Sequence, residues 1–123
     1  MNAEKIQQSL EKLKNLSTMI EGVALVSMEG FIMASVLPDA VGEERIAGLS
    51  ASFMALAGRC TSELGKGEPL QLFIQAQSGI VAMLGIGDGT CLCAVASKES
   101  KPGMVLFDMK KAAEEIRPLL ENF

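Results

Sequence analysis

The sequence predicts an α/β protein of the α+β type, with a single domain over residues 1–123. Three segments carry apolar residues at spacings of three and four, as amphipathic helices do. Five shorter runs, rich in β-branched residues, lie between turn signals, as strands do. Because 49% of the chain is apolar, a domain of this length can bury a core without disulfides or a metal.

The N-terminal part predicts a helix followed by a hairpin. Apolar positions from Ile6 to Ile20 lie on one helical face, so we expect a helix over residues 3–19. Two short apolar runs, residues 23–27 and 31–36, then flank a turn at Gly30. Glycine supplies the positive φ of a tight hairpin, so these runs are expected to pair antiparallel.

The middle of the chain predicts a long second helix and a meander. Acidic residues favour a helix start at residue 43, and Gly65 favours a stop after residue 64. Three closely spaced strands are expected over residues 70–77, 79–86 and 90–97.

The last helix is expected after residues 101–103, with Pro118 ending or kinking it because proline lacks an amide donor. Its apolar face is predicted to be Val105, Leu106, Met109, Ala112, Ala113, Ile116 and Leu120.

Strand order follows from which runs are apolar on both faces. Residues 23–26, 80–84 and 91–96 show no polar alternation, as expected for central strands covered on both sides. Residues 70–77 alternate, which places the third strand at an edge. The expected five-stranded antiparallel sheet therefore has the order 2-1-5-4-3, with the second helix on one face and the terminal helices on the other.

The second helix is apolar around most of its circumference, which indicates burial on two sides. The stripe expected to cover the sheet is Ile46, Leu49, Phe53, Leu56, Ala57, Cys60 and Leu64. A second stripe of smaller residues indicates a dimer in which the second helices pack together and the third strands join edge to edge. The alternative is a helix lying under a loop of its own domain. The expected dimer interface is Ala47, Ala51, Met54, Gly58, Gln71, Phe73 and Gln75.

Composition excludes several function classes. The chain has no His, Trp or Tyr, which excludes His-based triads and His-containing zinc sites within one chain. A net charge of −4 without stacking aromatics argues against nucleic acid as a partner. Three cysteines and no recognisable leader favour a reducing, cytoplasmic setting, and no run is apolar enough for membrane insertion.

No motif predicts catalysis, a cofactor or a metal. The glycine-rich segment 85–90 joins two strands and no helix follows it, so a hairpin is expected instead of a phosphate loop. Cys91 and Cys93 share one face of a strand, but only Cys60 remains as a third thiol, so buried thiols are favoured over a metal site. Ser50 has no neighbouring base. We therefore expect a protein that is not an enzyme.

Six segments, taken in their order and spacing, form a recognisable pattern: residues 20–23, 26–32, 46–52, Gly79 with Val81, 92–96 and 110–116. With these segments the chain resembles the Roadblock (dynein light chain) family over essentially its whole length. Two departures are Glu29, where the family often has Asp, and residues 100–102, where it often has Asn.

This resemblance implies a profilin-like fold and a homodimeric or heterodimeric platform for a small Ras-like GTPase. The bacterial gliding-motility members bind their GTPase across the paired second helices and accelerate GTP hydrolysis. A structural adaptor or motor-complex scaffold is the alternative. By this likeness the GTPase would contact Glu44, Gly48, Ser52, Ala55 and Arg59.

An arginine finger supplied in trans is a separate alternative. The sequence has only Arg45, Arg59 and Arg117 to offer, and the first two lie on the predicted second helix. Solvated charges at helix ends are the favoured explanation for them, and the bacterial family members act without an inserted arginine. We therefore expect the platform to work by holding the partner's switch loops.

Overall fold

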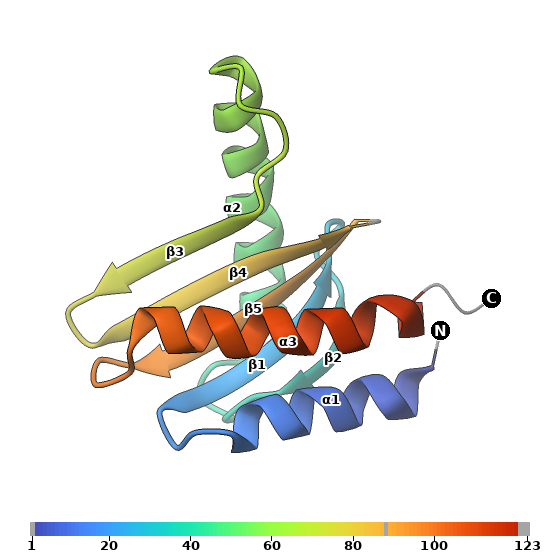
Figure 1. Ribbon diagram of the computed structural model, residues 1–123, viewed down its shortest axis with the longest axis vertical. Coiled ribbons are helices and arrows are strands. Elements are labelled where there is room, and N and C mark those ends of the chain that lie inside the picture. Colours follow the sequence, from blue (N-terminus) through green and yellow to red (C-terminus); the bar gives the residue numbers. More distant parts are fainter. Residues whose placement is uncertain (1, 88, 121–123) are drawn as a thin grey trace.

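The computed structural model describes residues 2–87 and 89–120, which form three helices and five strands (Figure 1). The first helix and hairpin are followed by the long second helix, a three-stranded meander and the last helix, as expected. The elements are α1 (Ala3–Asn15), β1 (Ile20–Ser27), β2 (Ile32–Val36), α2 (Glu43–Glu63), β3 (Gln71–Ala76), β4 (Gly79–Gly87), β5 (Thr90–Ser97) and α3 (Pro102–Leu120).

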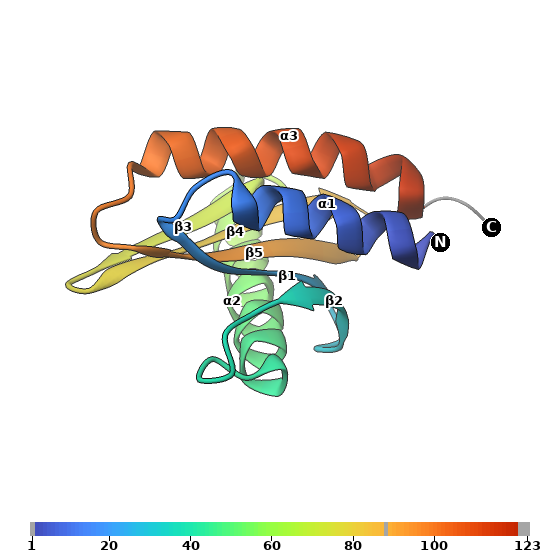
Figure 2. The ribbon, with the colours of Figure 1, turned by 90° about the horizontal axis from the view of Figure 1, so that it is seen from below.

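The strands form one antiparallel sheet in the order β2-β1-β5-β4-β3, which confirms the predicted topology. In the centre of the sheet, Leu92 of β5 lies between Leu25 of β1 and Leu84 of β4. Figure 2 shows α1 and α3 on one face and α2 on the other. β2 and β3 are the two edges.

The core on the α1/α3 face is the larger of two apolar layers. Leu10 and Met109 are fully buried there, and α1 and α3 pack against each other as well as on the sheet. The layer on the α2 face has fewer residues: Ala24, Val26, Ile46, Ala47, Met54, Met83, Cys91 and Cys93. Small sheet side chains such as Ala24 and Cys93 leave room for α2 to pack closely on this face.

Two helix ends differ from the prediction. α1 ends at Asn15 and not at Met19, and Ile20 belongs to β1, where it pairs with Ala96. The Ser17 hydroxyl accepts the Met19 N–H at 3.0 Å, which fixes the turn between helix and strand. Ile20 is buried in the sheet, so the chain leaves the helix before this residue.

α3 continues through Pro118 to Leu120. The last turn is held from outside: Arg117 Nε donates to the Ile86 carbonyl at 3.1 Å, and the Asn2 N–H donates to the Leu119 carbonyl at 3.1 Å. These contacts offset the loss of the backbone hydrogen bond that proline cannot donate.

Among the described residues, no helix has the length and apolar character needed to span a bilayer.

Candidate partner-binding surface

Most of α2 is rotated about its axis relative to the prediction, so that residues of the predicted dimer stripe face the sheet. Ala47, Ser50 and Met54 lie against the sheet and are buried. The sheet below them offers small side chains, including Ala24 and Cys93, so the small stripe of the helix fits there. Ala47 and Met54 were expected at a dimer interface, and the structure buries them inside their own subunit.

Of the stripe that was expected to cover the sheet, Ile46 is buried against it as predicted and Ala57 is half-buried, but the other five residues are exposed. Leu49 is 50% exposed, Leu56 62% and Leu64 69%, although all three are large and apolar. We call the exposed residues of this stripe the apolar strip: Leu49, Phe53, Leu56, Cys60 and Leu64. In Figure 1 the C-terminal half of α2 extends beyond β3, so the strip runs past the edge of the sheet.

The sheet surface on the α2 face is covered unevenly. α2 packs mainly on β1, β2 and β5. On the β3 and β4 side of this face, Leu72 and Val81 are only half-buried, and so is Val95 of β5. An exposed helical strip and a partly open apolar sheet surface therefore lie on the same face of the molecule.

The two edges of the sheet differ in how they are protected. At β2, the Gln7 side chain of α1 donates a hydrogen bond to the Ser35 carbonyl at 2.9 Å. β3 pairs only with β4 among the described strands, and Gln71 and Gln75 on it are exposed. Phe73 is half-buried and packs toward the α1/α3 core. An unpaired edge strand is a template for pairing with another chain.

The predicted GTPase contacts lie along one side of α2. Glu44, Gly48, Ser52, Ala55 and Arg59 are all exposed and follow one another at helical spacings. We call this row the crest. Arg59 forms an exposed ion pair with Glu63 at 2.6 Å, which contributes little to stability. The crest is polar or small throughout, in contrast to the neighbouring apolar strip.

Ala51 and Gly58 of α2, also predicted at the interface, are half-buried.

Among the described residues, no group of three or more His, Cys, Asp or Glu side chains could hold a metal ion. The glycine-rich loop is a hairpin, as expected: Gly87 pairs with Thr90, whose hydroxyl donates to the Gly87 carbonyl at 2.8 Å. Residue 88 of that loop lies outside the described residues.

The two strand thiols are buried between β5 and α2. Burial raises the pKa of Cys91 to about 12, and the neighbouring Cys93 thiol adds to this rise. Burial also raises the pKa of Cys93, against the opposite effect of the Ser50 hydroxyl. Cys60, by contrast, is exposed on α2.

We expect at most one thiol per folded chain, that of Cys60, to react with an aromatic disulfide reagent at pH 9. Thiolates are the reacting species, and at this pH the Cys91 thiol stays protonated and out of contact with solvent. Mass spectrometry of the labelled peptides measures the distribution. A Cys60→Ser variant that still takes up label while folded would contradict the prediction, and labelling in denaturant provides the full count.

Comparison with known families adds to this geometry. A family model described as the Roadblock/LC7 domain matches residues 5–96. An uncharacterised protein of Methanocaldococcus jannaschii is 29% identical over 100 residues, covering 81% of this chain and 87% of that protein.

Several solved structures share the fold, among them the following two. The Myxococcus xanthus protein MglB has a TM-score of 0.89 at 22% identity, covering 97% of this chain and 90% of that one. A profilin in a complex titled LokiProfilin1/rabbit actin has a TM-score of 0.65 at 19% identity, covering 94% of this chain and 96% of that one. At these identities the likeness concerns the fold alone, and it confirms the profilin-like architecture.

Proposed function

Because the chain belongs to the Roadblock/LC7 family, we propose that it is a homodimeric, non-enzymatic platform that binds a small Ras-like GTPase and regulates its GTP hydrolysis cycle. The observation that carries the proposal is the apolar strip of α2 beside the open edge of β3. A contiguous apolar surface of this kind marks a protein interface.

A second copy supplies what this surface lacks. The helix of the partner can cover the half-buried Leu72 and Val81 while its own strip packs against Leu49, Phe53 and Leu56. Pairing of the β3 edges, at Gln71, Phe73 and Gln75, would join two sheets by backbone hydrogen bonds. A two-fold axis makes such a contact self-complementary.

The crest is then the surface left for the GTPase. It lies on α2 but outside the strip, so dimer formation leaves Gly48, Ser52 and Ala55 accessible. Glu44 and Arg59 place opposite charges near its two ends, which suits an oriented polar contact. The GTPase brings its own phosphate loop and Mg²⁺, and the platform would hold its switch loops in a hydrolysis-competent arrangement.

We expect the dimer to raise GTP turnover by a small Ras-like GTPase from the same genome, measured by phosphate release under single-turnover conditions. Ser52→Arg, which places a large cation in the middle of the crest, should abolish the increase without dissociating the dimer. At a saturating concentration of the dimer, Arg45→Ala and Arg59→Ala should each retain at least half of it, because Arg59 is proposed to contribute to binding and no arginine finger is required.

The possible outcomes separate the alternatives. A stable complex with unchanged turnover identifies a structural adaptor or motor-complex scaffold. A hundredfold or greater loss on replacing one arginine identifies an arginine finger. Absence of any complex with the GTPase, for the homodimer and for a heterodimer with a paralogue, contradicts the proposal.

A further inference from the structure

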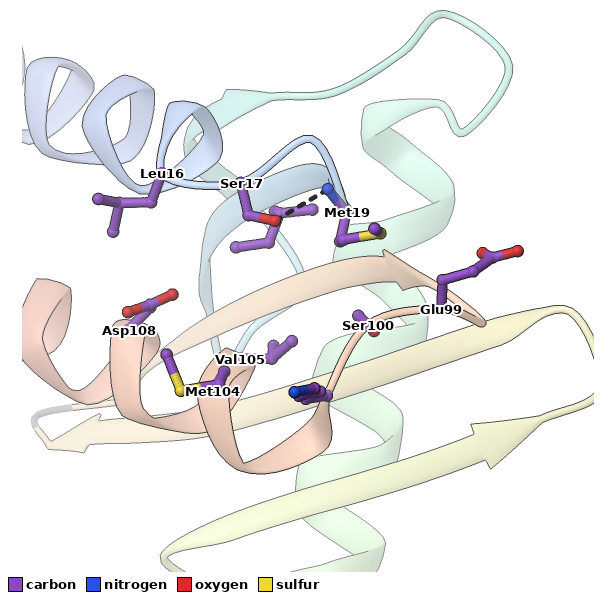
Figure 3. Close-up of a pocket in the computed structure, with 10 residues that line it drawn as sticks. Leu16, Ser17, Met19, Glu99, Ser100, Met104, Val105 and Asp108 are labelled. Carbon is purple, nitrogen blue, oxygen red and sulfur yellow. Dashed lines mark hydrogen bonds between the residues drawn. The ribbon is translucent and has the colours of Figure 1, made fainter.

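A groove of about 350 Å³ lies on the face of the sheet opposite α2, where the end of α1 meets the first turns of α3 (Figure 3). Its walls are apolar: Leu16 and Met104 are each 55% exposed, and Met19 is 39% exposed. The buried side chains of Ile20 and Val105 close its floor. Large apolar side chains from the α1–β1 connection and from α3 therefore converge on one exposed hollow.

Two carboxylates border this apolar groove. Figure 3 places Asp108 at one end and Glu99 at the other, with Val105 between them. Within the described part of the chain, neither carboxylate has an ion-pair partner within 4.0 Å. Lys101 also lines the groove, so its lining carries two negative charges and one positive charge.

Lys12 and Lys111 line a hollow beside Asp108, and each contacts another group. Lys12 Nζ lies 3.2 Å from Glu115, joining α1 to α3. Lys111 Nζ lies 5.2 Å from the centre of the Phe107 ring, a distance typical of a cation–π contact. Asp108 is thus a half-buried carboxylate beside an apolar surface, and a cation from outside the chain would complement it.

We propose that this groove binds a segment of a second partner protein through an inserted lysine or arginine. The aliphatic stem of that side chain would lie on Leu16 and Met104, and its cationic end would meet Asp108. Long basic side chains combine an apolar stem with a charged tip. The stem matches the apolar wall of the groove, and the tip matches the Asp108 carboxylate.

The shape of the groove favours a protein segment over a free amine. A second hollow of about 160 Å³ continues between α1 and α3, and Leu16 and Asp108 line both hollows. An extended chain can follow the two hollows, whereas a small amine occupies only one. The groove and the α2 crest lie on opposite faces of the sheet, so the platform could hold two partners together (Figure 2).

The test uses the methionine methyl resonances of the full chain, with Met19 and Met104 as reporters in the groove. The probes are N-acetyl-arginine methylamide and the citrulline counterpart, which has a similar shape without the charge. We expect saturable shifts of both reporters, with the arginine probe binding at least threefold more tightly than the citrulline probe.

Asp108→Asn should reduce the affinity of the arginine probe to that of the citrulline probe. Glu114→Gln, which removes an exposed carboxylate of the same helix outside the groove, should leave it unchanged. A seven-residue peptide with a central arginine between leucines should bind at least tenfold more tightly than the arginine probe. Equal binding of the two probes, or an unaffected Asp108→Asn variant, overturns the cation site. Peptide affinity equal to that of the arginine probe overturns the assignment to a protein segment.

Discussion

Leu56→Asp is expected to convert the dimer into a folded monomer. Leu56 lies in the apolar strip and is 62% exposed in the subunit, so the subunit core does not depend on it. In the dimer the new carboxylate would be buried against apolar side chains without a counter-charge, which costs about 3 kcal/mol or more. The dissociation constant should therefore rise at least about 100-fold. Sedimentation at micromolar concentration measures the change, and circular dichroism verifies that the variant is folded.

Ala55→Asp provides the matched control, because the neighbouring residue lies on the crest and is also exposed. It introduces the same charge into the same helix, one position away. We expect Ala55→Asp to stay dimeric and to lose GTPase binding, whereas Leu56→Asp loses the dimer. A wild-type chain that sediments as a monomer, or a Leu56→Asp variant that remains dimeric, would contradict the assignment of the strip.

The order of elements and strands could be predicted because helices and strands bury apolar residues with different periods. Residues 80–84 and 91–96 are apolar on both faces, and they do form central strands. The end of α1 could not be placed, because Ile20 continues the helical spacing of Ile6 and Leu13. Its true environment depends on pairing with Ala96, a contact distant in the sequence.

The orientation of α2 could not be predicted, for a related reason. Periodicity shows that the helix has two apolar stripes, but not which one faces the sheet. The deciding factor is the size of the side chains across the contact: Ala24 and Cys93 are small, and they accept Ala47 and Ser50 more closely than Leu or Phe. Side-chain volume along the predicted central strands was the signal available in the sequence.

The groove between α1 and α3 could not be predicted at all. Leu16 and Met104 are far apart along the chain, and each looks like an ordinary helical apolar residue. Only the packing of α1 beside α3 brings them together with Asp108. The β3 edge, in contrast, was identified correctly from the alternation of residues 70–77, which is a local property.

Gly79→Ala should destabilise the fold by about 2 to 3 kcal/mol, because the added methyl group would clash with the backbone of the neighbouring strand. A Cβ at this first residue of β4 would lie 2.6 Å from the Ala96 carbonyl oxygen of β5, well inside van der Waals contact. That oxygen belongs to the backbone of a central strand, so it cannot move aside as a flexible side chain would. The β3–β4 hairpin must shift instead, and it carries the edge proposed to pair in the dimer.

Gly48→Ala is the matched control for this substitution. Gly48 lies within α2, where an added Cβ meets no atom within 4 Å, so alanine should stabilise the helix by about 1 kcal/mol. Urea unfolding of both variants at one fixed protein concentration measures the difference, since dimer formation makes stability concentration-dependent. The two substitutions are expected to change the free energy of unfolding in opposite directions, which excludes a general effect of losing glycine. If Gly79→Ala unfolds at the same urea concentration as the wild type, the close approach of β4 to β5 at Ala96 is wrong.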